Sequence, residues 1–314
     1  MMRYNIAYAT DDNYVQHVAV SLVSLFSNNV NVRFEVYILS NAVSEVNMAH
    51  LKDIEKEYEQ TIYFIPVEQL LSKLSENNVS VNKLSISTYS RLYLSTLIPD
   101  NVNELLYLDC DTIIVGEIKG IWDFNLSDIF VAGVIDTMFP YYKKAIGLPN
   151  EKFYINAGVL FINLAKWRKS SIENAFMEFI NRYDGKVPHL DQGIINGVFH
   201  DKGILDLKYN VQTPIFLFKK YNKMLNYFSL SNYYSESMFE SAKKNSLIIH
   251  YSAFYADRPW FKFCLHPKKY LYCKYLELTP YKHCPLSKNV KSTLKDKVKS
   301  IFFVYCQNIY LRLR

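Results

Sequence analysis

Short apolar runs alternate with amphipathic segments along the first 135 residues of the chain. In the segment 14–27, Val18, Leu22 and Phe26 recur at helical spacing, which predicts a helix with one buried face. An alternation of strands and helices requires right-handed crossovers and builds a mostly parallel sheet that is covered on both faces. The pattern therefore predicts an α/β fold. The predicted strands span 4–10, 32–39, 61–67 and 104–109, and the predicted helices span 14–27, 44 to about 59, and 87–97.

The pattern is less regular beyond residue 135. Two long segments, 210–245 and 252–285, are rich in Tyr, Asn, Lys and Ser and have few periodic positions. We expect them to form loops and short helices that frame a binding site. The clearer signals in this half are a strand at 154–164, a helix at 165–183, a short helix that begins within 189–199, and a last strand at 246–251.

The composition excludes several classes of protein. Half of the 314 residues are apolar and 21% are charged, which excludes a disordered chain and a simple coiled coil. Only 9 residues are glycine, which argues against a glycine-rich phosphate loop. The first residues lack a secretory pattern, no run of 18 apolar residues occurs, and the five cysteines include no C-x-x-C pair. We therefore expect a protein of the reducing cytoplasm, without disulfides or a zinc site.

The positive charge is concentrated at one end of the chain. The net charge is +6, and residues 282–314 account for +7 with eight Lys or Arg and one acid, which leaves −1 for residues 1–281. The sequence thus predicts a near-neutral body at 1–281 and a basic tail at 282–314. This distribution favours an anionic surface as the partner of the tail, and it disfavours nucleic acid as a partner of the fold.

From Leu294 the tail has the pattern of an amphipathic helix. A helix of this kind can lie in a membrane interface, with its cations close to anionic headgroups. The alternative is a helix that packs on the body and leaves its lysines in solvent. The apolar stripe consists of Val298, Ile301, Phe302, Tyr305 and Ile309, and the basic stripe consists of Lys291, Lys295 and Lys299.

Acidic residues follow two of the predicted strands directly. The turn at 11–14, with Asp11 and Asp12, follows the first strand, and Asp109 and Asp111 close the fourth. Ligands of open α/β sheets bind outside the carboxyl ends of the strands, so both groups fall where a ligand is expected. Residues i and i+2 of a strand share a face, so Asp109 and Asp111 can reach one cation, either Mg²⁺ or Mn²⁺ held jointly with a diphosphate. The alternative is a solvated turn.

Three further positions carry suitable chemistry. His250 ends an apolar run, and an imidazole facing the two aspartates would shift the metal preference toward Mn²⁺; otherwise it is a core histidine. Asn156 and Gly158 lie inside a predicted strand, where an amide can bind sugar hydroxyls and a glycine permits close approach of a ligand, unless both simply pack in the core. Asp191 and Gln192 lie beside a glycine at a helix start, where Asp191 is alternatively an N-cap.

The sequence resembles the glycosyltransferases of family 8, in particular bacterial lipooligosaccharide α-galactosyltransferases and lipopolysaccharide glucosyl- or galactosyltransferases. The resemblance runs from about Asn5 to Trp260 and implies a GT-A type, Rossmann-like nucleotide-binding sheet flanked by helices. It depends on five motifs in a fixed order, which are ATDDNY at 9–14, STYSRLYL at 87–94, YLDCD at 107–111, YINAGVLFINL at 154–164 with KW at 166–167, and LDQG at 190–193.

The resemblance implies a UDP-sugar donor and a metal ion at the carboxyl edge of the sheet. In similar enzymes the first-strand motif holds the uridine and ribose, and the arginine of the STYSRL segment lies near the donor sugar and pyrophosphate. The ion, Mn²⁺ with Mg²⁺ as the alternative, lies between the phosphates. The implied donor-binding residues are Ala9, Asp11, Asn13, Tyr14 and Arg91, and the implied metal ligands are Asp109, Asp111 and His250.

The transferred hexose is implied to lie among carboxylates and amides. Gln192 occupies the position on the β face of the anomeric carbon, where it acts either as a nucleophile or as a stabiliser of an ion pair. Members of the family retain the anomeric configuration, so the implied reaction is retaining transfer of galactose or glucose. The residues implied to surround the hexose are Asp136, Asn156, Asp191 and Gln192.

The resemblance also implies an acceptor and a location. The acceptor is a lipid-linked oligosaccharide, the core glycan of a lipooligosaccharide or lipopolysaccharide. Similar transferases end in basic, aromatic segments that hold them at the inner membrane, and Arg312 and Arg314 fit that placement. We therefore expect a cytoplasmic protein that is peripheral on the inner face of the bacterial cytoplasmic membrane.

The last motif departs from the family pattern. The family has a His, two residues, a Gly, two residues and then Lys-Pro-Trp, whereas residues 250–260 read HYSAFYADRPW. The segment is two residues longer, it lacks the glycine, and Arg258 replaces the lysine. Arg258 is expected to bind the donor, because an arginine can still grip a pyrophosphate through planar bidentate donors. Two other functions stay open, a sugar nucleotidyltransferase and a noncatalytic sugar-nucleotide binder at the membrane.

Overall fold

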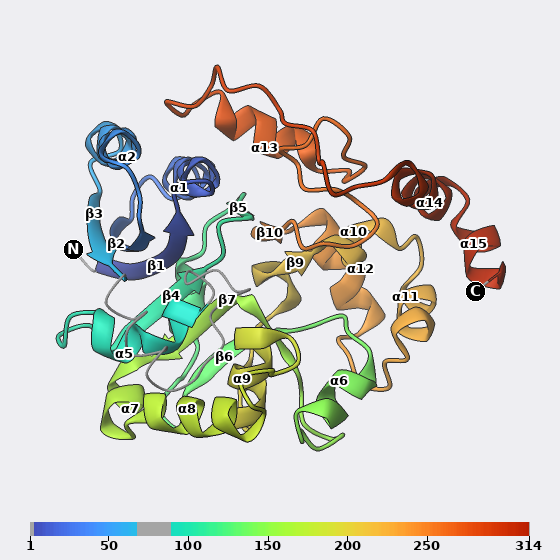
Figure 1. The fold of residues 1–314 in the computed structure, drawn as a ribbon, viewed down its shortest axis with the longest axis horizontal. Helices are drawn as coiled ribbons and strands as arrows, with labels where there is room; N and C mark the ends of the chain where they lie inside the picture. The colour runs from blue at the N-terminus through green and yellow to red at the C-terminus, as the bar shows by residue number, and fades with distance from the viewer. Residues whose placement is uncertain (1–2, 68–88, 314) are drawn as a thin grey trace.

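The chain folds around a seven-stranded sheet in the computed structural model, which describes residues 3–67 and 89–313 (Figure 1). The strand order is β3-β2-β1-β4-β7-β6-β8. Each of the four strands expected in the first 110 residues is present within one or two residues of its expected bounds. The strands are β1 (Arg3–Asp11), β2 (Arg33–Asn41), β3 (Thr61–Pro66), β4 (Glu104–Leu108), β6 (Val131–Ile135), β7 (Ile155–Asn163) and β8 (Gly203–Ile204).

One strand of this mostly parallel sheet, β7, is antiparallel to its neighbours. β1, β2, β3 and β4 are mutually parallel, and β7 is antiparallel to both of its neighbours, β4 and β6. Its first residues therefore lie at the edge where β1 and β4 end. Leu108 pairs with Val159, and the Asp109 amide donates to the Gly158 carbonyl oxygen at 2.8 Å. The reversal brings the start of β7 beside the acidic end of β4.

Helices cover both faces of the sheet, as the alternating pattern predicts. Ile6 and Tyr8 of β1 belong to one apolar cluster, and Ala7 and Ala9 belong to the other. Both clusters are buried because successive side chains of a strand point to opposite faces. The first face packs on α1 (Val15–Ser27) and α2 (Glu45–Glu57), and the second packs on α5 (Leu94–Leu97), α7 (Leu164–Lys169), α8 (Ile172–Arg182) and α9 (Leu190–Val198).

Two expected helices differ from the structure. The single helix expected at 165–183 is α7 followed by α8, because Ser171 adopts a left-handed conformation with φ 47° that ends the first helix. In the helix expected at 87–97, residues 87 and 88 lie outside the described part, and a 3₁₀ turn (Arg91–Tyr93) precedes α5. Ser44 caps α2 as expected, accepting a hydrogen bond from the Asn47 amide.

A small second sheet connects the two halves of the chain. Its central strand, β10 (Ile248–His250), is antiparallel to β5 (Thr112–Ile114) and parallel to β9 (Val211–Gln212). His250 pairs with Thr112, which directly follows Asp111. The segments expected to form loops and short helices contain α10 (Thr213–Leu217), α11 (Tyr221–Phe228), α12 (Glu236–Lys244) and α13 (Lys269–Leu276), and α6 (Pro140–Ala145) follows β6.

The basic tail packs on the body through one face and exposes another. It forms α14 (Leu294–Tyr305) and α15 (Gln307–Leu313), at the end of the molecule beside α11 (Figure 1). Phe303 is fully buried, and its ring stacks on Tyr255 with a centroid distance of 4.3 Å. The Gln307 amide donates to the Leu217 carbonyl oxygen at 3.0 Å. The exposed large apolar side chains of the two helices are Leu294, Val298, Ile301, Tyr305 and Ile309.

Two expectations about the chain as a whole can be compared with the structure. All five cysteines are free. Among the described residues no helix combines the length and the apolar composition needed to cross a bilayer. Arg314 lies outside the described residues, so its expected position at the membrane is not addressed by the fold.

Phe303→Ala should destabilise the protein strongly. The substitution removes a fully buried ring and leaves a cavity between the tail and the body, at a cost of about 3–5 kcal/mol. Ile301→Ala is the matched control on the same helix, because Ile301 is 43% exposed and its truncation should cost no more than about 1 kcal/mol. Thermal unfolding followed by circular dichroism measures both. Equal midpoints for the two variants would show that the tail is not part of the cooperative fold.

Candidate active site

The turn after β1 is fixed by its own first carboxylate. Asp11 Oδ1 accepts hydrogen bonds from the amides of Asn13, at 3.0 Å, and Tyr14, at 3.1 Å. The ring of Tyr14 is 47% exposed at this edge. The Cys110 thiol donates to the Ala9 carbonyl oxygen at 3.1 Å, which ties β1 to the acidic end of β4. The four residues expected to hold a nucleoside therefore lie beside the segment that carries Asp109 and Asp111.

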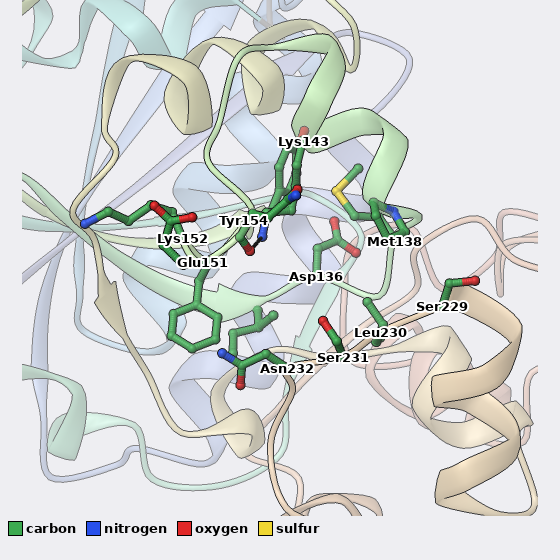
Figure 2. Close-up of a pocket in the computed structure, with 14 residues that line it drawn as sticks. Asp136, Met138, Lys143, Glu151, Lys152, Tyr154, Ser229, Leu230, Ser231 and Asn232 are labelled. Atoms are coloured by element: carbon green, nitrogen blue, oxygen red, sulfur yellow. Dashed lines mark hydrogen bonds between the residues drawn. The ribbon is translucent and has the colours of Figure 1, made fainter.

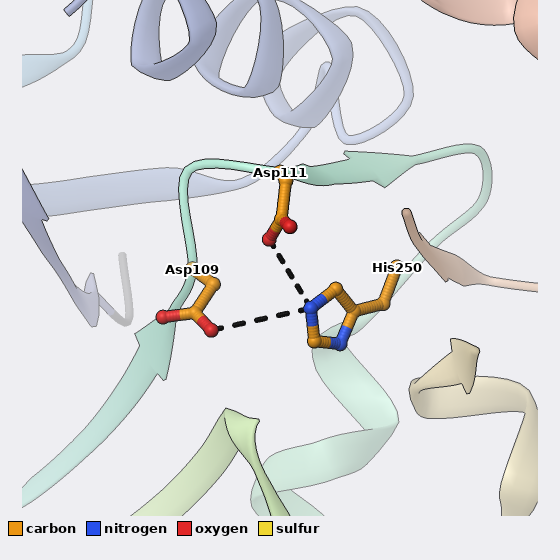
Figure 3. Close-up of side chains that lie close together, drawn as sticks. All are labelled: Asp109, Asp111 and His250. Carbon is orange, nitrogen blue, oxygen red and sulfur yellow. Dashed lines mark ion pairs between the residues drawn. The ribbon is translucent and has the colours of Figure 1, made fainter. Parts of the chain in front are cut away.

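Two carboxylates and an imidazole converge at the centre of this edge (Figure 3). His250 Nε2 lies 3.1 Å from Asp111 Oδ1 and 4.0 Å from Asp109 Oδ2. One ligand atom from each of the three residues lies within 4.8 Å of the others. The structure thus brings together Asp109, Asp111 and His250, a triad drawn from residues more than 130 positions apart in the sequence. The set of two oxygens and one imidazole nitrogen suits Mn²⁺.

The hydrogen-bond network determines which ring nitrogen of His250 faces the carboxylates as a ligand. The Gly158 amide donates to Asn156 Oδ1 at 3.0 Å, so that atom is an oxygen, and it also accepts from Asn210 Nδ2 at 2.9 Å. Asn210 Oδ1 then faces His250 Nδ1 at 3.1 Å, so Nδ1 carries the proton and donates. In the neutral ring this leaves the Nε2 lone pair directed at Asp109 and Asp111. Two acceptors 3.1 Å apart require a proton or a cation between them, so the triad fits a cation.

The sequence interpretation missed Asn210. The residue is fully buried and connects the triad to Asn156. It lies in the segment 210–245, where no periodic signal sets it apart from other polar residues. Its role depends on contacts with residues 40 and 54 positions away.

Neighbouring charges shift the pKa values of two members of the triad, Asp111 and His250. Burial raises the pKa of Asp111, but Arg258 and His250 lower it by more, so the pKa of this carboxyl lies below its usual range. Burial lowers the pKa of His250, and Asp111 and Asp109 more than offset that effect, so the net pKa is raised. The triad therefore favours the ionised carboxylate beside a positive charge.

Glycine at position 158 is required for the triad to form. A Cβ there would lie 2.3 Å from Cε1 of His250, a distance that real Cβ atoms essentially never show, and 3.0 Å from Oδ2 of Asp109. The glycine inside β7, which the sequence associated with close approach of a ligand, in fact makes room for the imidazole ring. Position 193 also requires glycine, because a Cβ there would lie 1.9 Å from the Pro188 carbonyl oxygen.

A buried guanidinium links the triad to α9. Arg91 donates to Asp109 Oδ1 at 2.8 Å and to the Ala157 carbonyl oxygen at 2.8 Å, and its Nε lies 3.1 Å from Asp191 Oδ2. Its planar face lies over the ring of Tyr107. Burial raises the pKa of Asp191 to about 6, although Arg91 lowers it in part. Asp191 is therefore an ion-pair partner and not the N-cap of α9, which is His189.

Amides and a carboxylate form a second cluster beside the triad. The Gln192 side-chain amide donates to Asp136 Oδ2 at 2.8 Å, and Asn156 Nδ2 donates to the same oxygen at 3.0 Å. Gln192 Oε1 accepts from the Ala157 amide at 2.9 Å and from Asn156 at 3.2 Å. All four residues expected around a hexose are thus connected to one another, three directly and Asp191 through Arg91 and Ala157.

Although the segment 250–260 is longer than in the family pattern, its arginine lies beside the triad. Arg258 Nη2 lies 3.0 Å from Asp111 Oδ2, and Nη1 donates to the Tyr251 carbonyl oxygen. Trp260 stacks on His17 with a centroid distance of 3.7 Å. Tyr255 adopts a left-handed backbone with φ 37°, a conformation that glycine favours, and its hydroxyl lies 2.7 Å from that of Tyr310 in the tail. The added length therefore contacts the tail and leaves Arg258 at the site.

A cavity of about 340 Å³ joins the triad to the amide cluster. His189 and Leu190 both adopt positive φ angles, 59° and 55°, on its wall. A left-handed backbone is uncommon in non-glycine residues, and such conformations concentrate at functional sites. The cavity is lined by Arg91, Asp109, Ala157, His189, Leu190, Asp191 and Gln192.

Comparisons with known proteins agree with this geometry. The family described as Glycosyl transferase family 8 matches residues 5–264. A putative glycosyltransferase of Haemophilus influenzae is 29% identical over 202 residues, which are 63% of this chain and only 60% of that protein. A lipopolysaccharide 1,2-glucosyltransferase of Escherichia coli is 27% identical over 309 residues, 96% of this chain and 86% of that protein. The solved structure of the galactosyltransferase LgtC with donor and acceptor sugar analogs superposes with a TM-score of 0.72 at 25% identity, over 88% of this chain and 96% of that chain.

Arg91→Met should destabilise the fold as well as the site. The change leaves Asp109 and Asp191 without their shared counter-charge, and breaking a buried ion pair in this way costs about 3–5 kcal/mol. Arg182→Met is the control, because Arg182 is exposed at the end of α8 and its loss should change stability by about 0.5 kcal/mol or less. Chemical denaturation of the two variants tests this. An Arg91→Met protein as stable as wild type would contradict the assigned ion pairs.

Proposed function

Because the chain belongs to glycosyl transferase family 8, we propose that this glycosyltransferase is a retaining hexosyltransferase that moves galactose or glucose from a UDP-sugar to a lipooligosaccharide or lipopolysaccharide core glycan. The observation that supports it best is the convergence of Asp109, Asp111 and the Nε2 lone pair of His250 beside the cluster of Gln192 and Asp136. A cation-binding group next to hydroxyl-binding groups suits a nucleotide sugar. The named relatives, a glucosyltransferase and a galactosyltransferase, leave both hexoses as candidates.

The triad would hold Mn²⁺, with Mg²⁺ as the alternative. The bound cation supplies Lewis-acid stabilisation of the negative charge that develops on a departing diphosphate. Asn210 keeps the His250 ring in the tautomer that offers Nε2, which is the usual role of a partner behind a metal-binding imidazole. Gly158 provides the space that this ring needs.

The turn after β1 would hold the nucleoside part of the donor. Asp11 uses its carboxylate to fix the amides of Asn13 and Tyr14, so its contribution is to shape the turn. The exposed ring of Tyr14 offers a face or an edge to the base, and Ala9 lies at the end of the same strand. Arg258 lies beside the triad and can grip the pyrophosphate with paired donors, as a planar guanidinium does.

The second cluster would face the sugar as the glycosidic bond breaks. Positive charge then develops on the hexose, and the carboxylates of Asp136 and Asp191 with the amide dipole of Gln192 stabilise it. Gln192 Oε1 already accepts two hydrogen bonds, which orients the oxygen and lowers its nucleophilicity. This arrangement favours a stabilising role for Gln192. Arg91 keeps Asp191 in place.

The tail would hold the enzyme at an anionic membrane on the cytoplasmic side, where lipid-linked acceptors reside. Its buried face is occupied by the body, so the face available to a membrane carries Val298, Ile301, Tyr305 and Ile309. Exposed lysines on the same segment, including Lys291 and Lys295, would add attraction to anionic headgroups. The proposed location is therefore peripheral, on the inner face of the bacterial cytoplasmic membrane.

The other two functions receive less support. The noncatalytic binder required that the altered segment 250–260 fail to close, whereas Arg258 pairs with Asp111 and Trp260 packs edge-on against Tyr14. The family that matches the chain is described as one of glycosyl transferases, which favours transfer of a sugar over transfer of a nucleotidyl group.

Asp111→Asn tests the proposed reaction. Wild type should release UDP from UDP-hexose only when Mn²⁺ is present, and the variant should lose about a thousandfold in rate, since one charge pair ~4 Å apart at an effective dielectric near 20 contributes roughly 4 kcal/mol. Asp128→Asn is the control, because Asp128 is exposed and is not a member of the triad. Metal-independent release by wild type, or unchanged turnover in a folded Asp111→Asn protein, would refute the metal assignment.

A double variant tests the membrane proposal. Lys291→Glu with Lys295→Glu keeps Phe303 in place, unlike a truncation, and should weaken binding to vesicles of anionic lipid by about 2 kcal/mol or more, roughly thirtyfold. Lys56→Glu with Lys186→Glu makes the same charge change on exposed residues outside the tail. Sedimentation with phosphatidylglycerol and phosphatidylcholine vesicles compares the two. Equal sedimentation of both double variants would contradict the proposal that the tail binds anionic membranes.

A further inference from the structure

The protein has a cavity at the edge of the sheet opposite to the triad. The pocket of about 260 Å³ beside Asp136 adjoins the amide cluster and therefore belongs to the site already described (Figure 2). A cavity of about 500 Å³ lies instead where β1 and β4 begin and the antiparallel β7 ends. Glu104 lines it and precedes Asp109 along β4, so roughly 16 Å of strand, at ~3.3 Å per residue, separates the cavity from the triad.

Asparagine side chains dominate the wall of this cavity. Four of its eight lining residues are asparagine. Two of them are held in place, because Asn163 caps α7 and Asn5 donates to the Glu104 carbonyl oxygen at 3.3 Å. The other two, Asn101 and Asn103, are exposed, and their side-chain amides form no hydrogen bond with the described residues. An amide both donates and accepts, so these side chains are suited to hydroxyl groups of a ligand.

One carboxylate of the wall has no positively charged partner within the described part of the chain. The Arg3 guanidinium, which also lines the cavity, pairs with Glu35 at 2.6 Å. No ion pair or hydrogen bond from the described residues reaches the Glu104 carboxylate, and its partial burial raises its pKa. A carboxylate in this environment is stabilised by charge-assisted hydrogen bonds, which neighbouring hydroxyl groups of a sugar ring can donate in pairs.

An indole ring forms the apolar part of the wall. Trp122 is half-buried, and its ring packs on Tyr4 with a centroid distance of 4.6 Å and edge-on against Phe161 at 5.6 Å. Its N–H donates to none of the residues that the structure describes. Such a ring can pack on the C–H face of a pyranose while polar neighbours bind the hydroxyl groups. The volume of the cavity falls in the range of ~300–1,000 Å³ that is typical of pockets for small molecules.

A calcium ion is a less suitable occupant of the same cavity. Ca²⁺ takes about 6–8 oxygen ligands, commonly with several carboxylates among them. The lining supplies one carboxylate, Glu104, and two aromatic residues, Tyr4 and Trp122. The combination of amides, one acid and an indole ring favours a sugar.

We propose that this cavity is a noncatalytic glycan-binding site, which holds neutral hexose rings through Trp122, Glu104 and the asparagine amides. The proposal goes beyond the proposed function, because the cavity is separate from the residues that would carry out transfer. Binding there requires neither the sugar-nucleotide donor nor a metal ion.

The experiment uses the tryptophans of the protein as reporters. The chain has three, and each lies in a different place: Trp122 in this cavity, Trp260 against Tyr14 at the active site, and the fully buried Trp167 in the core. Lactose and maltose are titrated separately, without donor or metal, into protein that carries ¹⁵N-labelled tryptophan, and the indole signals are followed by NMR. At least one disaccharide should shift the Trp122 signal in a saturable way and leave the Trp167 signal unchanged.

Two variants of the wall test whether the shift comes from this cavity. Glu104→Gln should weaken binding of the disaccharide by about tenfold, because a neutral amide replaces the charged acceptor. Asn103→Ala should weaken it by about fivefold through the loss of one hydrogen bond. Asn181→Ala is the matched control, an exposed asparagine of α8 that does not line the cavity, and it should bind like wild type. UDP release from UDP-hexose should stay within about twofold of wild type in all three variants, since distant sites act independently.

Three results would overturn the glycan site. These are no saturable shift of the Trp122 signal with either disaccharide, unchanged affinity in the folded variants of the wall, and a Trp122 signal that responds to Ca²⁺ but to neither sugar. If Glu104→Gln fails to fold by circular dichroism, the exposed Asn103→Ala substitution decides the test. Absence of UDP release by wild type would instead contradict the proposed function and leave this site unaffected.

Discussion

The site depends on one buried guanidinium held between two carboxylates. Arg91 is almost inaccessible, and it contacts Asp109 at the end of β4 and Asp191 at the start of α9. Removing three charges from water is costly, and only their mutual attraction and hydrogen bonds offset that cost. The geometry of Asp109 and that of α9 are therefore set together. A shift of either element would leave a charge without a partner.

A second set of contacts, a chain of hydrogen bonds that does not include Arg91, also crosses the site. It passes from His250 through Asn210 to Asn156 and then to Asp136 and Gln192. Each member is both a donor and an acceptor except the terminal carboxylate, so the orientation of each amide determines the next. The imidazole tautomer at one end and the amide orientation of Gln192 at the other are thus parts of one network. The proposed metal site and the proposed sugar site share it.

Much of the fold and of the site was predictable from local patterns. Asp109 and Asp111 could be placed because a strand alternates its side chains and a parallel sheet gathers its carboxyl ends at one edge. Gly158 signalled a close approach, although its neighbour proved to be His250 and not a ligand. The break at Ser171 and the strands β5, β8 and β9 were not predictable, because elements of two or three residues are too short to show a period. Asn210 was missed because its partners are far along the chain.

The contact between the tail and the segment 250–260 has a practical consequence for anyone who shortens this chain. Tyr255 keeps an unfavourable backbone conformation while Phe303 covers its ring and Tyr310 meets its hydroxyl. A fragment cut before α14 for easier handling would lack both partners, and relaxation at Tyr255 would propagate three residues along to Arg258. Assays on such a fragment would measure an enzyme in which Arg258 is displaced. A lower transfer rate of the fragment could then be mistaken for a requirement for lipid.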